Sequence, residues 1–508
     1  MKSIYQIFML SFLLLAGTAC ENNFEDINTD DTRPGSVDPV FQLNQGIIGT
    51  SPGGSVISYE FAILRQVHSP FRGVLEGANT NSTNPGSTGA VWNNFYPNVV
   101  KNLVDAVANT AQVPDRINAS SALRIMRAYA FMTLTDTYGD VPYVEAGQGF
   151  LSQIEFPSYD TQESIYDDII SELQAATAAF NPGADDISQE ILFGGDLDRW
   201  QRFGNSLLLR AGMRLSKVDP ARAQTIVQSA IAGGLMQSNL DNAAIEHNPS
   251  FQYPVGNTLN GTESANYYLD RVFVDHLQAN DDPRLEKIAV RYVGAVSGGE
   301  QSAGIATTDP ALQFGLDQGF DQGGVDEVAA ELGLVGLYDF SQADRNRIAN
   351  QQAPSFLVTY AQTMLLLAEA RVRGWDGGDP AEAYEAGIRG HMLQFASYPN
   401  STAVEVAAID DYIAAHPLTT GSELEQINTE YWIASFMAGY DGWANFRRSG
   451  FPDLEPNPLE GELTGSGERF IRRLVYPDGE RTVNLENLNA AVSRQGNDEL
   501  STRIWWDQ

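Results

Sequence analysis

The chain has 508 residues, of which 43% are hydrophobic, so it is long enough to bury a large core. It carries 65 Asp and Glu residues against 31 Lys and Arg residues, a formal net charge of −34. This balance argues against nucleic acid and against an anionic lipid surface as partners, because both require clustered Lys and Arg side chains.

The N-terminus has the features of a secretion signal. Lys2 precedes an apolar run over residues 7–16, and small residues follow at 17–19. A positive start, a short apolar stretch and small residues are typical of a cleaved signal peptide. The apolar run is too short to span a bilayer. We therefore expect residues 1–19 to be removed.

The single cysteine, Cys20, follows the small residues directly. This arrangement resembles the lipobox of bacterial lipoproteins, in which the thiol is acylated and becomes the new N-terminus. Residues 20–38 are polar and acidic and show little periodicity, which is typical of a tether. We expect Cys20 to be lipidated and the protein to be held at a membrane by lipid alone.

Helical periodicity dominates the chain after residue 39. Leu123, Met126, Ala130 and Leu134 lie at helical spacing, and Gly139 follows as a stop signal. Helices are expected in pairs with short connections, namely 200–217 with 220–233 and 356–373 with 380–396. Such pairs predict a mainly α fold of stacked, degenerate tetratricopeptide-like hairpins, forming one domain over residues 39–508.

Capping residues mark several helix starts. Asp219 and Asp379 each precede a proline, the pattern of an N-cap followed by Pro at the first helical position. Asp160 with Glu163, and Ser422 with Glu425, have the spacing of capping boxes. We expect helices to begin at these four places.

Two regions depart from the helical pattern. Residues 50–90 are rich in Gly, Ser, Asn, Thr and Pro, and residues 245–350 mix Gly-rich loops with short β-like segments such as 288–293. Long irregular stretches in a compact protein are often functional. We therefore expect the ligand-binding surface in these two regions.

No specific catalytic or metal-binding motif is present in the sequence. It contains no phosphate loop, nucleophile elbow or dinucleotide fingerprint. None of the histidines lies in a zinc-binding helix motif; they are His68, His247, His276, His391 and His416. Acidic pairs such as Asp281-Asp282 carry little weight in so acidic a chain. We expect a protein without cofactor or metal that is not an enzyme.

Aromatic residues in the irregular regions are the best candidates for ligand contacts. Flat rings stack on the C–H faces of sugars, while neighbouring amides and charged groups bind the hydroxyls. Trp92 and Asn94 follow the first irregular region, and Tyr292, Phe320 and Tyr338 lie in the second. For any single aromatic residue, packing in the core is the competing interpretation.

The order of several short motifs resembles one known family, the SusD/RagB-like outer-membrane nutrient-binding lipoproteins. The segments that carry the resemblance are, in chain order, 23–30 (NFEDINTD), Trp92 with Tyr96, 127–143 (RAYAF through TDTYGDVPY), 159–166 (YDTQESIY), 205–214 (NSLLLRAGMR), 282–284 (DPR), 442–452 (GWANFRRSGFP) and 473–477 (RLVYP). They span nearly the whole chain.

The resemblance implies more than the residues show by themselves. Family members are helical proteins on four tetratricopeptide-like pairs that lie over a SusC-type TonB-dependent transporter and act as its lid. They capture glycans, or peptides in some members, at the outer-membrane surface and have no catalytic activity. The family's ligand sites lie near the region of Trp92, which makes Trp92 the first candidate, followed by Tyr292 and Tyr338.

Three alternatives stay open at this stage. The same scaffold could bind peptides, the chain could be a surface glycoside hydrolase, or it could be an adhesin without a small ligand. A hydrolase needs two carboxylates about 5–9 Å apart with one raised pKa. Among glycans, the acidic charge favours neutral ones.

Overall fold

The computed structural model describes residues 37–508, except for residues 112, 114, 262–263 and 321. The predicted signal peptide, the predicted lipidation site Cys20 and nearly all of the predicted tether lie outside the described residues. Within the described part of the chain, no helix combines the length and the apolar character needed to cross a membrane.

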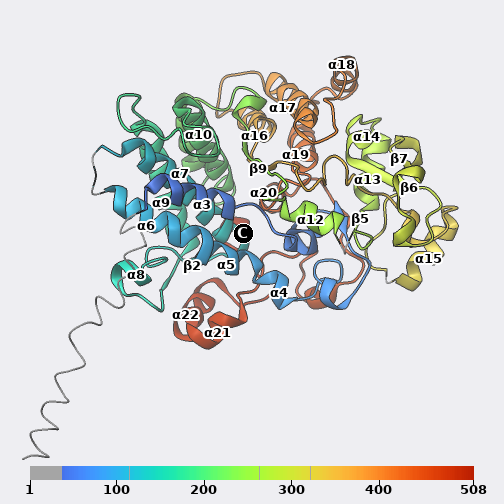
Figure 1. Cartoon of the computed structure of the whole chain (residues 1–508), viewed down its shortest axis with the longest axis horizontal. Coiled ribbons are helices and arrows are strands. Elements are labelled where there is room, and N and C mark those ends of the chain that lie inside the picture. Colours follow the sequence, from blue (N-terminus) through green and yellow to red (C-terminus); the bar gives the residue numbers. More distant parts are fainter. Residues whose placement is uncertain (1–36, 112, 114, 262–263, 321) are drawn as a thin grey trace, which may run out of the picture.

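The first part of the scaffold is a stack of helices in which neighbours pack together (Figure 1). Its helices are α3 (Pro39–Gly49), α5 (Ala90–Asn94), α6 (Lys101–Ala111), α7 (Ile117–Tyr138), α9 (Gln162–Ala179), α10 (Leu197–Arg214) and α11 (Pro220–Gly233). Helix α7 packs against α6 and α9, and α10 packs against α9 and α11. Because other helices enclose it, α7 is buried on nearly all sides.

The second part of the scaffold continues the stack. Its helices are α16 (Tyr360–Val372), α17 (Pro380–Gln394), α18 (Val406–Ala415), α19 (Glu423–Ala434) and α20 (Asp441–Ser449). Helix α16 packs against α17 and α19 and also against α10, which joins the two parts. The predicted mainly α, helix-pair fold is confirmed, including the pairs α10 with α11 and α16 with α17.

Capping explains where several of these helices begin. Asp219 accepts a hydrogen bond from the backbone N–H of Arg222, and Asp379 accepts one from that of Ala381, as predicted for both N-caps. The helix expected at Asp160 begins two residues later, because Thr161 is the N-cap. Ser422 precedes α19, but its side chain makes no capping hydrogen bond.

The helix predicted over residues 356–373 is too long at its N-terminal end. Residues Ser355–Val358 form a strand that pairs with residues 243–245, and the helix begins only at Tyr360. Thr359 and Gln362 form a capping box that fixes this start. The apolar run fits a buried strand as well as a buried helix, so periodicity alone could not separate them.

Short antiparallel strands connect distant parts of the chain. They are β1 (Val67–His68) with β5 (Tyr268–Leu269), β2 (Val141–Pro142) with β3 (Tyr159–Asp160), β4 (Ala243–Ile245) with β9 (Ser355–Val358), and the three-stranded sheet β7 (Ala306–Thr307), β6 (Ala289–Tyr292) and β8 (Gln342–Ala343). Strand β6 confirms the β-like segment predicted at 288–293.

We call residues 268–343 the β lobe. It contains β5 to β8 with helices α13 (Arg271–Ala279), α14 (Arg284–Ile288) and α15 (Gln322–Glu331). Two small apolar clusters lie within it, one around Tyr268 and Leu316 and one around Tyr292. The lobe extends from one end of the helical scaffold (Figure 1).

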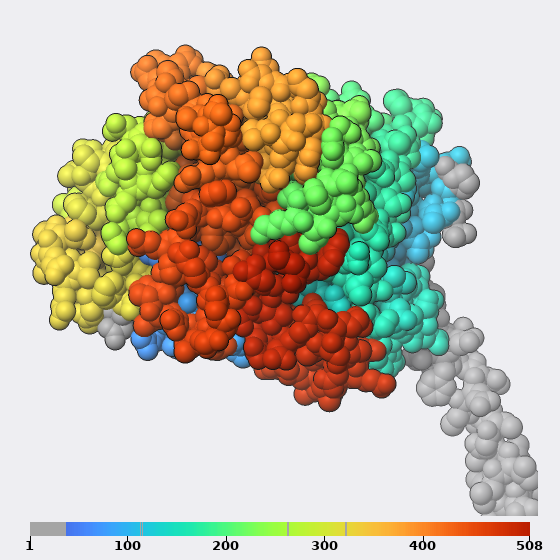
Figure 2. All heavy atoms as spheres, turned by 180° about the vertical axis from the view of Figure 1, so that it is seen from behind, coloured from blue at the N-terminus to red at the C-terminus, as the bar shows by residue number. Residues whose placement is uncertain are grey.

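The remaining helices are short and peripheral. They are α4 (Pro85–Thr88), α8 (Gly149–Ser152), α12 (Pro254–Asn260), α21 (Asp478–Val483) and α22 (Leu485–Gln495). The chain also contains two π-helical turns. Ile57–Phe61 lies in the first irregular region, and Phe95–Val100 follows that region directly. Seen from behind, the orange-to-red C-terminal part lies between the yellow β lobe and the blue-green N-terminal helices (Figure 2).

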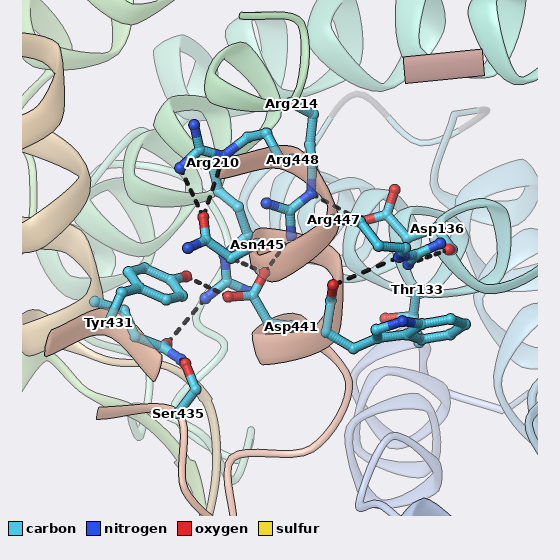
Figure 3. A network of polar contacts seen from close by, with 12 residues as sticks. Thr133, Asp136, Arg210, Arg214, Tyr431, Ser435, Asp441, Asn445, Arg447 and Arg448 are labelled. Atoms are coloured by element: carbon cyan, nitrogen blue, oxygen red, sulfur yellow. Dashed lines mark hydrogen bonds and ion pairs between the residues drawn. The ribbon is translucent and has the colours of Figure 1, made fainter. Parts of the chain in front are cut away.

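A buried network of charged side chains ties α7, α10, α19 and α20 together (Figure 3). Arg210 and Arg214 of α10 both contact the carboxylate of Asp441, which also accepts a hydrogen bond from the Tyr431 hydroxyl. The Nε of Arg214 lies 3.1 Å from an oxygen of Asp136 on α7. Burial raises the pKa of Asp441, but the two guanidiniums outweigh it and hold that pKa below its ordinary value.

Helix α16 joins this network through Gln362, whose side-chain oxygen accepts from Arg210 at 3.0 Å, and it holds α20 by a second set of contacts at Glu369. The two oxygens of Glu369 accept hydrogen bonds of 2.7 and 2.6 Å from Arg448, and Arg373 donates another of 2.8 Å. Burial by itself raises the pKa of Glu369, but Arg448 and Arg373 lower it to about 2. The acidic chain therefore places many of its arginines inside the scaffold rather than on a basic surface.

Candidate functional site

The two irregular regions predicted to carry the binding surface lie side by side. Strand β1 of the first pairs with β5 of the second, and the side-chain amide of Gln318 donates to the Ala62 carbonyl at 2.6 Å. His68 Nε2 lies 3.2 Å from the carbonyl oxygen of Asp317. These contacts hold loops from opposite parts of the sequence in one surface.

A third segment, near the C-terminus, joins them. Asn457 donates from its amide nitrogen to the carbonyls of Ala78 and Asn79, at 2.9 and 2.8 Å. Arg65 donates to the carbonyl of Glu455 at 2.9 Å. We call the surface formed by residues 69–84, 313–320 and 453–469 the loop face.

The loop face contains a cavity of about 650 Å³, the size range of small-ligand sites. Asn81, Asn457, Glu460 and Arg469 supply polar groups to its lining. The backbone of Gly319, the residue before Phe320, lies against Pro458, which lines this cavity. Phe320 is 39% exposed, so a ligand at this surface can reach it.

Tyr292 and Tyr338 come together in the β lobe. Both pack in the small cluster that contains Val290 and Ala295. Tyr338 is half-buried and keeps part of its ring in solvent, whereas Tyr292 is only 5% exposed. The Arg345 guanidinium lies 5.1 Å from the Tyr292 ring centroid. Of these two predicted residues, Tyr338 is the one a ligand can reach.

Trp92, the first candidate from the sequence, is a packing residue in the structure. It is 6% exposed and its ring contacts Tyr96, Tyr138, Tyr159 and Tyr476, with centroids 4.7 to 5.8 Å away. Stacking on a sugar requires an open ring face, and these four tyrosines leave none. The structure therefore gives no support to a direct ligand contact by Trp92.

Asn94 lies on the same short helix and also has internal partners. Its side-chain nitrogen donates to the Gly49 carbonyl at 2.8 Å, and its oxygen accepts from Asn98. These bonds hold α5 against α3. Trp92 and Asn94 are thus not brought to the loop face, whereas Phe320 is part of it.

The structure shows concave surfaces that the sequence reasoning missed. Phe150 lines two adjoining cavities, of about 780 and 530 Å³, between α3, α6 and α8, and Tyr96 lines the second. The only sequence signal was a phenylalanine in a Gly-rich turn, Gly147 to Phe150. Asn457 and Arg469 were missed because they lie far from both irregular regions in sequence.

The loop face supplies groups that can bind a ligand. Within the described residues, no cluster of three or more His, Cys, Asp or Glu side chains has the geometry to hold a metal ion. Burial raises the pKa of Glu60 to about 8, but this carboxyl is only 2% exposed, which keeps substrate away from it. Rings, amides and an arginine around an open cavity are suited to holding a polar ligand.

The fold is a helical-repeat scaffold that carries a loop-built surface with a cavity. The chain belongs to the SusD-like family: the family model described as starch-binding and associating with the outer membrane matches residues 55–477.

Solved structures show the same fold over nearly the full length. A chitin-binding protein is 28% identical, with a TM-score of 0.81, and the match covers 92% of this chain and 100% of that one. A SusD-like protein described as Bacteroidetes AC2a is 29% identical, with a TM-score of 0.80, and the match covers 93% of this chain and 100% of that one. A SusD homologue from Bacteroides uniformis, 22% identical over 92% of this chain and 98% of that one, has a TM-score of 0.75. The search of curated proteins found no match.

Proposed function

We propose that this protein captures a polysaccharide or oligosaccharide at the cell surface and delivers it to a SusC-type TonB-dependent transporter, over which it acts as a lid. The family match over residues 55–477 carries the proposal. The solved relative named a chitin-binding protein supports a glycan as the ligand class. The protein acts by binding and release and performs no chemistry on the glycan.

The loop face supports this function as the place of capture. Phe320 provides a ring for stacking, Tyr338 provides another elsewhere in the β lobe, and the cavity of the loop face is lined by amide and charged side chains. Trp92 and Asn94 contribute indirectly, by fixing the helices behind the surface. The net charge of −34 favours a glycan that is neutral over most of its length.

Lipidation of Cys20 would hold this face at the outer-membrane surface. The residues between Cys20 and the start of α3 at Pro39 supply the tether. A lipid anchor, rather than a spanning segment, would let the whole molecule move toward and away from a transporter.

Calorimetry tests the function directly. Residues 21–508 are titrated with chito-oligosaccharides, starch, other neutral and anionic polysaccharides, and a peptide digest. We expect heat from one glycan class and unchanged glycan length after hours of incubation. Heat from peptides alone would replace the glycan with a peptide ligand, and shortened glycans would reveal an enzyme.

A further inference from the structure

The segment between β2 and β3 carries an unusual number of exposed apolar side chains. We call residues 144–157, which include α8, the α8 loop (Figure 1). Its base is closed because the Glu145 carboxylate accepts hydrogen bonds of 2.7 and 2.8 Å from the backbone N–H and the hydroxyl of Ser158. Four large apolar side chains of the loop are exposed, by 64, 91, 38 and 54% in the order Val144, Phe150, Leu151 and Phe156. Single exposed apolar residues are ordinary, but a group of them marks an interaction surface.

The middle of the α8 loop carries no charge. Glu145 and Glu155 stand near its two ends, and residues 146–154 between them include no Asp, Glu, Lys or Arg. In a chain with 65 acidic residues, such a segment is well placed to leave water, because no charge has to be desolvated. Transfer of the exposed Phe150 ring to an apolar environment is favourable. The loop is therefore suited to an apolar partner that carries little charge at its surface.

The α8 loop lies at the side of the molecule from which the chain leads to its anchor. Phe150 and Leu151 line a cavity of about 780 Å³, and so does Val37, the first described residue. Even fully extended, residues 20–36 can place Val37 no farther than roughly 60 Å from a lipid on Cys20. The proposed anchor thus keeps the ring of Phe150 close to a bilayer, at a high local concentration. The occupant of this surface that needs no further protein is the lipid surface itself.

We propose that the α8 loop inserts into the headgroup boundary of the bilayer that carries the lipid anchor, with Phe150 as the deepest side chain. This inference goes beyond the proposed capture of a glycan, and it rests on the proposed lipidation of Cys20. The anchor holds the protein at the membrane, and the loop determines which end of the molecule faces it. The apolar side chains favour insertion, whereas Glu145 and Glu155 favour a lipid surface without net negative charge.

A fluorophore beside Phe150 tests the insertion in the lipidated protein. Acylation consumes the thiol of Cys20, the only cysteine, so Ser152→Cys supplies the single free thiol for a polarity-sensitive label. The protein is reconstituted into phosphatidylcholine vesicles with plain or brominated acyl chains. We expect brominated chains to quench the label at position 152. A label at Thr420→Cys, between α18 and α19 at the opposite end of the molecule, should keep its full emission (Figure 1).

A matched pair of variants in the Ser152→Cys protein assigns the insertion to one ring. Phe150→Asn is expected to shift the equilibrium about tenfold toward the withdrawn loop, the effect of losing one buried aromatic side chain, and so to remove the quenching. Leu240→Asn replaces a side chain that is 80% exposed on another part of the surface and should keep the quenching. Adding anionic phosphatidylglycerol to the vesicles should weaken the quenching, because it repels the two glutamates of the loop.

Flotation of the vesicles separates the proposal from the anchor on which it rests. If the labelled protein does not float with the vesicles, the proposed lipid anchor fails and the insertion fails with it. Protein that floats while the label at position 152 is not quenched overturns the insertion alone, and leaves the α8 loop as a surface for a protein partner. Quenching that survives in Phe150→Asn, or that is equal at positions 152 and 420, also overturns it.

Discussion

At the scale of single residues, Glu60 is the most unusual titratable group of the scaffold. It lies on the π-helical turn Ile57–Phe61, and its Oε1 is buried without a partner. Burial raises its pKa to about 8, although the positive charge of Arg447 acts to lower that pKa. A carboxyl whose pKa is higher in the folded state than in the unfolded state makes the protein less stable as the pH rises.

The pH dependence of unfolding should report this group. The contribution of Glu60 is fully present below its unfolded pKa near 4.5 and is lost as the pH rises toward about 8. We expect Glu60→Gln, which stays neutral, to be more stable than the wild type at pH 8 by about 2 kcal/mol or more and similar to it at pH 5. Urea unfolding at the two pH values measures the difference; a gap that is the same at both would contradict the assignment.

Phe320 of the loop face and Tyr338 elsewhere in the β lobe lead to a second residue-scale prediction. Phe320→Ala and Tyr338→Ala should each weaken glycan binding about tenfold, because each removes a stacking ring worth about 1–2 kcal/mol. Phe156→Ala is the control, since Phe156 is 54% exposed and its carbonyl accepts a hydrogen bond from Asn487 of α22, a helix outside the loop face. Calorimetry with the best glycan of the panel measures all three, and equal losses in all three variants would mean that the loop face is not the site.

Trp92 now has a different expected behaviour from that of a ligand residue. Removing its ring from among four tyrosines leaves a cavity, so we expect Trp92→Ala to lower the free energy of unfolding by about 3–5 kcal/mol. The glycan affinity of the molecules that stay folded should change little. Unchanged stability together with lost affinity would restore Trp92 as a contact residue.

At the scale of elements, the sequence was enough to predict a helix start or a short strand where neighbouring residues alone determine it. The N-caps Asp219 and Asp379 and the strand at 289–292 were predictable because caps and short β segments are set by neighbouring residues. Strand β9 was missed because its partner, β4, lies more than 100 residues away. The enclosure of Trp92 was missed for the same reason, since Tyr138, Tyr159 and Tyr476 reach it from distant segments.

The junction of β9 and α16 provides an element-scale prediction. Thr359 ends the strand and caps the helix, and its hydroxyl accepts from the backbone N–H of Gln362 at 3.1 Å. We expect Thr359→Val, which keeps the shape but removes the acceptor, to destabilise the protein by about 1–2 kcal/mol. Thermal unfolding measures it. Thr402→Val is the control: the position is exposed and outside any helix or strand, and its hydroxyl accepts only a solvent-exposed hydrogen bond from Lys287, so Tm should stay unchanged.

At the scale of the whole molecule, the candidate site was only partly accessible to sequence reasoning. The two irregular regions were correctly expected to differ from the scaffold, and Phe320 and Tyr338 within them remain accessible to a ligand. The contribution of residues 453–469 was not foreseen, because their connection depends on Asn457 reaching the backbone at 78–79. Composition marks a loop but does not show which other loops it meets.

The predicted anchor gives a test at the same scale. Cys20→Ala, expressed with its signal sequence in a Gram-negative host, should yield a folded protein that leaves the membrane fraction, because acylation of the thiol is its only expected attachment. Immunoblots of membrane and soluble fractions measure this. Lys217→Ala is the control and should stay with the membrane. A Cys20→Ala protein that remains membrane-bound would contradict the lipid anchor.

The hydrogen bonds from Asn457 to residues 78 and 79 also have a consequence for the order in which the loop face forms during synthesis. A chain is synthesised from its N-terminus, so the first helix pairs can fold long before residue 457 exists. The loop face, where we propose that the ligand binds, is complete only when nearly nine-tenths of the chain has been made. We therefore expect a chain that ends before residue 457 to keep much of its helical content and to bind no ligand. Ligand binding then distinguishes complete chains from incomplete ones.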